Sequence, residues 1–243
     1  MPHEESFAAR VTRLGALADP VRRALYRFVV AQQEPVSRDQ AADGVEVPRH
    51  TAKHHLDRLV EEGLLVTEFR RLTGRTGPGA GRPAKLYRRA DTDIAVSLPH
   101  RRYDLAGAVL ADAVERSLAG TPLHAAVHDA ATAAGARVAG ETPAAEPGTP
   151  PLDRLSRALA PHGYEPREED PDEPAAEPVA EHRLVLGNCP FDQLAADHTE
   201  LICGMNLSFV DAVAEGIGCS GLRAGLDPDP ERCCVTVHDP DRP

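Results

Sequence analysis

The sequence lacks the features of several protein classes. It has no run near the roughly 18 uninterrupted apolar residues of a membrane-spanning helix, and its first residues lack the apolar centre of a secretory signal. It has no GxSxG or HExxH motif, and the GPGAGRP stretch lacks the Gly-Lys-Ser/Thr ending and the strand-to-helix setting of a phosphate-binding loop. We therefore expect a cytoplasmic protein that does not contact a membrane and is not an enzyme.

Cysteine is absent from most of the chain. No cysteine precedes Cys189, and the other four lie between Cys203 and Cys234. An odd number of cysteines in a reducing compartment disfavours a framework of disulfides. Ligation of a metal or cluster, redox sensing and ordinary buried thiols remain open for this region.

Charge is distributed unevenly over the 243 residues. Residues 1–103 carry 18 Lys and Arg against 13 Asp and Glu, a net charge of +5, whereas residues 104–243 carry 9 against 25, a net charge of −16. This asymmetry indicates one part that faces nucleic acid and an acidic part with another role.

Helix signals in the first part predict a helix-turn-helix. The Asp19-Pro20 pair separates a short helix from a longer one that runs to about residue 31. Ser37 and Gln40 have the spacing of a capping box that opens a short helix, and we expect Gly44 to end it.

After a turn at residues 45–47, a third helix is predicted from Pro48 to about Glu62, with Gly63 as its stop. Its apolar stripe leaves polar side chains on or near the outer face. A helix that enters the major groove uses its N-terminal side chains to reach base edges. The predicted DNA contacts of this helix are Arg49, His50, Thr51, Lys53 and His54.

A basic hairpin follows the third helix. Residues 64–69 and 85–88 are predicted strands around a Gly- and Pro-rich loop, and residues 69–89 hold seven basic residues and no acidic one. Arg75, Arg82 and Lys85 on this wing are expected to reach phosphates or the minor groove of double-stranded DNA.

The remaining elements complete a predicted α+β fold. We expect two Ala-rich helices in residues 101–139, a linker, a helix from Leu152 to a glycine cap at Gly163, and a hairpin tip or loop in the acidic residues 165–181. A strand at 182–186, two helices and strands at 222–226 and 233–237 follow.

These elements predict three regions. They are a winged helix-turn-helix DNA-binding domain at 1–95, a helical connector or dimerisation segment at 96–140, and a cysteine-rich sensor domain at 150–243. Because helix-turn-helix proteins usually bind two half-sites, we expect a homodimer.

The cysteine spacings do not match a structural zinc knuckle. Thirteen residues separate Cys189 from Cys203, fifteen separate Cys203 from Cys219, and thirteen separate Cys219 from the Cys233-Cys234 pair. Four thiolates from separate elements can hold a 4Fe–4S or 2Fe–2S cluster, whereas zinc and a metal-free thiol switch remain alternatives. A metal- or redox-handling protein that uses its winged helix for protein contacts is a further alternative function.

Neighbouring residues on a strand face opposite sides, so only one of Cys233 and Cys234 is expected to bind the same centre; Cys233 is our choice. His198 is a further candidate ligand, although a helix-capping role is simpler.

Several phrases carry a resemblance to a known family. LGALADPVRRALYRFV, VPRHTAKHHLDRLVEEGLL and GRPAKLYR resemble ArsR-like winged helix-turn-helix repressors, in particular the suf-operon iron-sulfur repressor subgroup. NCPFDQLAADHTELICGMN and RCCV resemble the cluster-binding domain of that subgroup. The resemblance implies a DNA-binding transcriptional repressor that senses iron-sulfur or redox status. It implies ligands at Cys189, Cys203 and Cys233 or Cys234, with Cys219 as the fourth.

Overall fold

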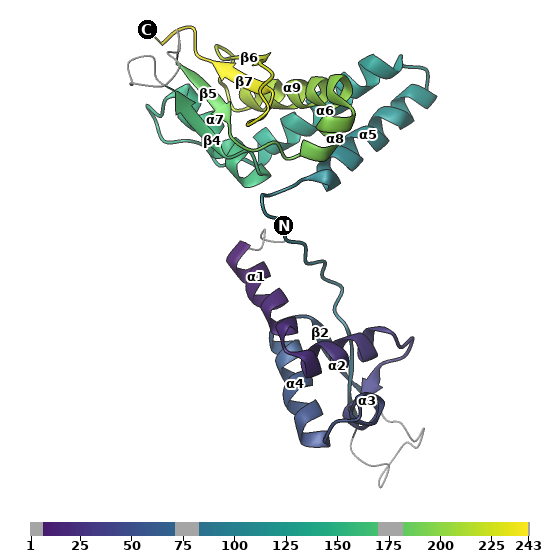
Figure 1. Ribbon diagram of the computed structural model, residues 1–243. Coiled ribbons are helices and arrows are strands. Elements are labelled where there is room, and N and C mark those ends of the chain that lie inside the picture. The colour runs from purple at the N-terminus through teal and green to yellow at the C-terminus, as the bar shows by residue number, and fades with distance from the viewer. Residues whose placement is uncertain (1–6, 71–82, 170–181, 243) are drawn as a thin grey trace. The chain divides into compact units, whose positions relative to one another are not determined.

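The computed structural model describes residues 7–70, 83–169 and 182–242, and the chain divides into two compact units, Met1–Val96 and Ser97–Pro243 (Figure 1). No helix within these described ranges is long and apolar enough to cross a membrane.

The N-terminal unit combines short helices with a small antiparallel sheet. Its sheet has the strand order β1-β3-β2, and Leu25, Leu56 and Leu59 are among the fully buried side chains of its core. Its elements are α1 (Phe7–Gly15), η1 (Ala16–Ala18), α2 (Pro20–Val30), β1 (Val36–Ser37), α3 (Arg38–Val45), α4 (Arg49–Glu61), β2 (Leu65–Arg70) and β3 (Ala84–Arg89). Helices α3 and α4 with the β2–β3 hairpin have the arrangement predicted from the sequence.

Local caps explain where these helices begin. The Asp19 side chain accepts a hydrogen bond from the Arg22 backbone N–H at 2.8 Å, so α2 starts at Pro20 as predicted. The capping box of α3 is also confirmed, because Ser37 Oγ accepts from the Gln40 N–H and Gln40 Oε1 accepts from the Ser37 N–H.

Two helix boundaries differ from prediction. Gly44 does not end α3; the helix continues to Val45, and Glu46 adopts the left-handed conformation with φ of 55°. The Phe28 ring occupies the space that a Cβ at Gly44 would need, so this glycine serves packing. Pro48 is the N-cap of α4 and not its first residue.

The C-terminal unit contains a four-stranded antiparallel sheet with the order β4-β5-β7-β6. Helix α9 packs against β6 and β7, and α7 packs against β4 and β5. Its elements are α5 (Tyr103–Leu118), α6 (Leu123–Glu141), α7 (Pro151–Leu159), η2 (Ala160–His162), β4 (Pro166–Glu169), β5 (Arg183–Leu186), α8 (Asp192–Asp197), α9 (Thr199–Gly216), β6 (Arg223–Leu226) and β7 (Val235–His238).

Helices α5 and α6, predicted as a connector or dimerisation segment, contribute to the core of this unit. Small residues let α6 approach α9 closely. A Cβ on Gly135 would lie 2.5 Å from the Phe209 carbonyl oxygen, and a Cβ on Gly216 would lie 2.5 Å from Ala139 Cβ. The Ala-rich composition therefore builds a tight helix seam.

The acidic stretch contributes to the sheet. Residues 166–169 form β4 and pair with β5, although they were expected in a hairpin tip or loop, and residues 170–181 lie outside the described part. The last strand begins at Val235, two residues later than predicted, so Cys233 and Cys234 precede it.

Candidate DNA-binding surface and cysteine site

Helix α4 presents polar side chains on the face opposite its buried stripe. Ala52, Leu56 and Leu59 point into the core and are fully buried. The predicted contacts Arg49, His50, Lys53 and His54 are exposed, and Thr51 is half-buried. The Arg49 side chain is 68% exposed although its Nε lies 3.5 Å from Asp39 Oδ1 of α3. Four donors are thus available on one helix face.

Lys85 is not a free cation of the wing. Its Nζ lies 2.6 Å from Asp57 Oδ1 of α4, and the Tyr87 hydroxyl donates to the same oxygen at 3.0 Å. Burial disfavours the charged form of Asp57, but the hydrogen bonds from Lys85 and Tyr87 outweigh it and lower the pKa of Asp57. The contact joins strand β3 to the predicted recognition helix. Arg75 and Arg82, the other predicted wing contacts, lie outside the described residues.

Four of the five cysteine thiols lie together in the C-terminal unit. Cys189 lies in the turn between β5 and α8, Cys203 lies in α9, and Cys233 and Cys234 lie between β6 and β7. The thiols of Cys189 and Cys233 interact by hydrogen bonding, and so do those of Cys203 and Cys234 and those of the adjacent pair. Three separate segments therefore supply one thiol group.

Cys219, the predicted fourth ligand, has other neighbours than these four thiols. Its thiol donates to the Pro151 carbonyl at 3.7 Å, and burial raises its pKa while Arg154 and Asp239 are its charged neighbours. Cys234 takes its place beside the other thiols. Strand alternation does not separate Cys233 from Cys234, because both residues precede β7.

The four thiols differ in pKa because of their hydrogen bonds and their burial. The hydrogen bond with Cys233 is the main cause that lowers the pKa of Cys234 to about 6, and Cys203 and Arg232 act in the same direction. The pKa of Cys189 is also lowered, again mainly by Cys233. The pKa of Cys233 is raised by its hydrogen bonds to Cys189 and Cys234 and by burial, and burial raises that of Cys203 to about 12. Cys189 and Cys234 are thus the two more acidic thiols of the four.

A buried polar chain supports this thiol group. Asn206 of α9 donates from Nδ2 to Cys233 Sγ at 3.2 Å, and the Tyr164 hydroxyl donates to Asn206 Oδ1 at 2.6 Å. Tyr164 is fully buried between Phe191 and Phe209, and this burial raises its pKa. The hydroxyl stays protonated and keeps Asn206 oriented toward the sulfur.

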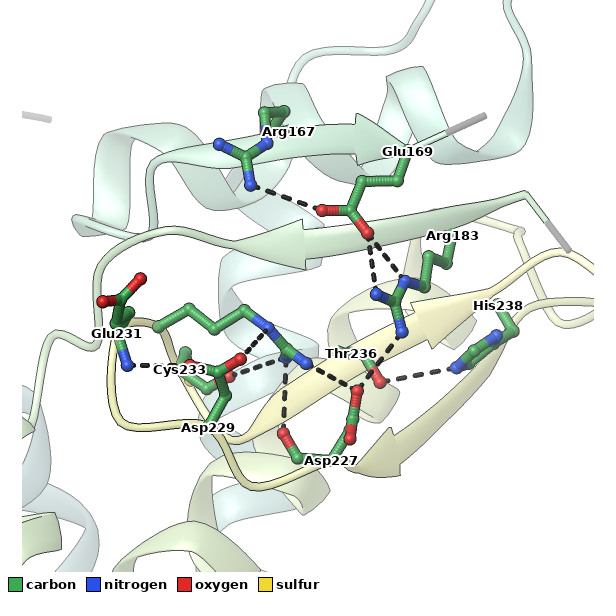
Figure 2. Close-up of polar contacts among 10 residues, drawn as sticks. Arg167, Glu169, Arg183, Asp227, Asp229, Glu231, Cys233, Thr236 and His238 are labelled. Atoms are coloured by element: carbon green, nitrogen blue, oxygen red, sulfur yellow. Dashed lines mark hydrogen bonds and ion pairs between the residues drawn. The ribbon is translucent and has the colours of Figure 1, made fainter. Parts of the chain in front are cut away.

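Ion pairs fix the loop that carries Cys233 and Cys234 (Figure 2). Arg232 Nη2 lies 2.6 Å from Asp227 Oδ2, and its Nε lies 3.3 Å from Asp229 Oδ2. Arg183 of β5 contacts Glu169 of β4 at 2.8 Å and Asp227 at 3.3 Å (Figure 2). Backbone bonds add to this, since Cys233 N–H donates to the Leu186 carbonyl.

The described side chains are not arranged as a metal cage. Within residues 7–70, 83–169 and 182–242, no group of three or more His, Cys, Asp and Glu side chains is placed to hold a metal ion. His198 is exposed at the N-cap position of α9 and makes no side-chain cap hydrogen bond.

Residues 17–68, from η1 through most of β2, match a family model described as a helix-turn-helix domain. The N-terminal unit contains a helix-turn-helix domain. This match supports a DNA-binding regulator. The cysteine site lies outside the matched residues, and a comparison of the chain with curated proteins finds no match.

Among solved structures, the crystal structure of human N-acetylserotonin methyltransferase in complex with SAM covers 68% of this chain and 48% of that chain. The identity is 19% and the TM-score is 0.21. This chain spans about half the length of that enzyme. At so low a TM-score the likeness has no bearing on fold or activity.

Outside the helix-turn-helix domain, the sequence prediction missed Tyr164, Asn206 and Arg232. Asn206 carried a signal, because a single amide interrupts the apolar ICGMNLSFV stretch of a helix. Tyr164 lies far from Asn206 and from the cysteines in sequence, and only the fold brings it to them. Arg232 directly precedes Cys233, but its ion pairs with Asp227 and Asp229 become visible only in the structure.

Proposed function

We propose that the protein is a homodimeric transcriptional repressor that binds a double-stranded DNA operator and senses iron-sulfur or redox status through its C-terminal cysteines. The observation that carries this proposal is the group of four thiols in a chain that contains a helix-turn-helix domain. The chain is a binding protein in this proposal and not an enzyme, and it acts in the cytoplasm.

The donor set suits an iron-sulfur cluster. Such clusters are held by cysteine thiolates, and Cys189, Cys203, Cys233 and Cys234 supply four sulfurs from three segments. The Asn206 amide donates to the Cys233 sulfur, and hydrogen bonds of this kind tune a cluster. Because the thiols are not arranged as a ready-made cage, ligation would couple to the positions of their segments. A bound cluster would supply a redox-sensitive centre.

A metal-free thiol switch is the second candidate, and zinc remains an alternative occupant. The hydrogen bond between Cys203 and Cys234 and the lowered pKa of Cys234 favour the switch, because a thiolate is the reactive form. In this case hydrogen peroxide oxidises the two thiols to one disulfide and is reduced to two water molecules.

An apolar surface supports the homodimer. Val114 and Leu118 at the end of α5 are 51% and 84% exposed, and Leu123 at the start of α6 is 56% exposed. A cavity of about 800 Å³ between α6 and α9 lies beside this surface; Leu123 and the exposed Leu201 line this cavity, with the buried Val127 and Met205. Exposed apolar surface of this kind often marks a protein interface. Light scattering after size exclusion tests it: Leu118→Asp with Leu123→Asp should yield monomers.

Anaerobic purification tests the occupant of the cysteine site. The expected protein is brown, contains iron and sulfide, and loses both in Cys189→Ser. A colourless protein with stoichiometric zinc would overturn the cluster in favour of zinc. A metal-free protein in which peroxide joins Cys203 to Cys234 would favour the thiol switch.

DNA binding is tested with a duplex from the chain's own promoter, by fluorescence anisotropy at several salt concentrations. Arg49→Ala with Lys53→Ala should lower affinity about a hundredfold, since each lost base or phosphate contact costs about tenfold. Arg137→Ala with Arg157→Ala removes the same charge from exposed positions of the C-terminal unit and is the matched control. Equal losses in the two double variants would reject α4 as the recognition helix.

A further inference from the structure

The segment that follows the N-terminal unit is bound directly to the loop that carries Cys189. Residues 97–102 begin the C-terminal unit and lead into α5. Arg101 Nη1 donates to the Cys189 carbonyl at 2.6 Å and to Asn188 Oδ1 at 2.6 Å, and its Nη2 lies 3.0 Å from Asp192 Oδ2. One guanidinium thus contacts Asn188 and Cys189 of the loop and Asp192, the first residue of α8.

Asn188 also holds this segment through its own side-chain amide. This side chain is buried, with 6% of its surface exposed, and its Nδ2 donates to the His100 carbonyl at 2.9 Å and to the Gly163 carbonyl at 2.5 Å. A Cβ at Gly163 would lie 3.0 Å from the same His100 oxygen, so the close approach suits a glycine. The Arg102 N–H adds a backbone bond to the Pro190 carbonyl at 3.0 Å.

The neighbouring arginine has different side-chain partners. Arg102 contacts Asp104 in α5 and His162 Nδ1 at 3.0 Å. Both arginine side chains are mostly buried, at 20% and 21% exposure. Arg101 alone of this pair uses its guanidinium to bind the Cys189 loop, so the two residues form a matched comparison.

We propose that Arg101 and Asn188 are positioning residues that couple the state of the Cys189 thiol to the segment entering the DNA-binding unit. The proposal rests on the function proposed above and names how that cysteine site regulates DNA binding.

The coupling is expected because only a few covalent bonds separate the thiol of Cys189 from its backbone carbonyl. Its thiol belongs to the thiol group, while its carbonyl accepts from Arg101. A change in ligation or oxidation that moves the Cys189 side chain also moves or rotates this backbone. Hydrogen bonds from a charged guanidinium are short and directional, so the segment either follows that movement or loses the bonds. The protein before and after the change at Cys189 thus differs in the hydrogen bonds that hold residues 97–102. Coupling between two sites requires such a difference in contacts between the two states.

A double-mutant cycle on DNA affinity tests the coupling in the full chain, purified anaerobically. Cys189→Ser should change the dissociation constant for the promoter duplex about tenfold in the wild-type background, within the usual range for coupled sites. In the Arg101→Ala background the same substitution should change it less than about twofold, because the connection is already lost. In the Arg102→Ala background the full change should remain.

Amide hydrogen exchange provides a second measurement that does not depend on the Arg101 variant. Cys189→Ser should speed exchange at the Arg101 and Arg102 amides relative to wild type, since both N–H groups are hydrogen-bonded in this segment.

These experiments distinguish failure of the proposed sensing from failure of the proposed coupling. If Cys189→Ser leaves DNA affinity unchanged in the wild-type background, the proposed sensing fails and the coupling fails with it. If Cys189→Ser changes affinity equally with and without Arg101, or leaves exchange at residues 97–102 unchanged, the coupling is wrong while sensing stands.

Discussion

The candidate DNA-binding surface and the thiol group are built in opposite ways. Arg49, His50, Lys53 and His54 come from one helix and are exposed, whereas the four thiols come from three segments and two of them are buried. A surface on one helix needs only that helix to be in place. A buried group needs every segment that contributes to it. Substitutions should therefore affect binding alone in the first region and both binding and packing in the second.

The cysteines give the largest expected effect. If the protein holds the proposed iron-sulfur cluster, Cys234→Ser should abolish its retention, because the Cys234 thiol contacts those of Cys203 and Cys233, while Cys219→Ser should retain it. Iron and sulfide analysis of anaerobically purified protein, with the visible spectrum, measures both. Loss in Cys219→Ser and retention in Cys234→Ser would restore the assignment predicted from the sequence.

Two lysines sharpen the description of the DNA-binding surface. Lys53→Ala should lower DNA affinity about tenfold and reduce the slope of affinity against salt by about one, as expected for one phosphate contact. Lys85→Ala should have a smaller effect, because its ammonium group already pairs with Asp57. Anisotropy titrations over a salt series compare them. If both variants reduce the salt slope equally, then Lys85 leaves Asp57 and binds a phosphate when the protein is on DNA.

Two glycines test how tightly the C-terminal unit is packed. Gly135→Ala should destabilise it by about 1–3 kcal/mol, the usual cost of overpacking, because the added Cβ would lie 2.5 Å from a backbone oxygen. Gly107→Ala in α5 meets nothing within 4 Å and should stabilise by about 0.5–1 kcal/mol. Urea unfolding followed by circular dichroism measures both free energies. A stabilising Gly135→Ala would contradict the close approach of α6 and α9.

The capping box of α3 gives the smallest expected effect. Ser37→Ala should lower the free energy of unfolding of the N-terminal unit by about 1 kcal/mol, since the Gln40 N–H loses its side-chain acceptor. Ser37→Thr retains an oxygen at this position and should stay close to wild type. Thermal unfolding of the full chain compares the variants, and equal midpoints for Ala and Thr would exclude a stabilising cap.

The local signals of the N-terminal unit made its fold predictable. Asp19, Ser37 and Gln40 act through bonds within three residues along the chain, so sequence spacing alone locates them. Gly44 was predicted to end α3, but the glycine is needed here for a tertiary contact that sequence spacing does not reveal. The Phe28 ring packs over it.

The cysteine site was predictable only in part. Clustering in the sequence singled out the five thiols, but spacing could not show that Cys219 turns toward Pro151. The alternation rule failed at Cys234 because it assumed a strand that starts two residues later. Tyr164 and Arg101 approach the site across long sequence separations, for which the sequence holds no local pattern.

The seam between α6 and α9 has a mechanical consequence. Its closest contacts are made by glycine and alanine, which have no side-chain rotamers that can absorb a displacement. A shift of α9 at Cys203 would therefore find little room for local repacking at this seam. We expect α6 and α9 to move together, so that a small change at Cys203 is felt by both helices.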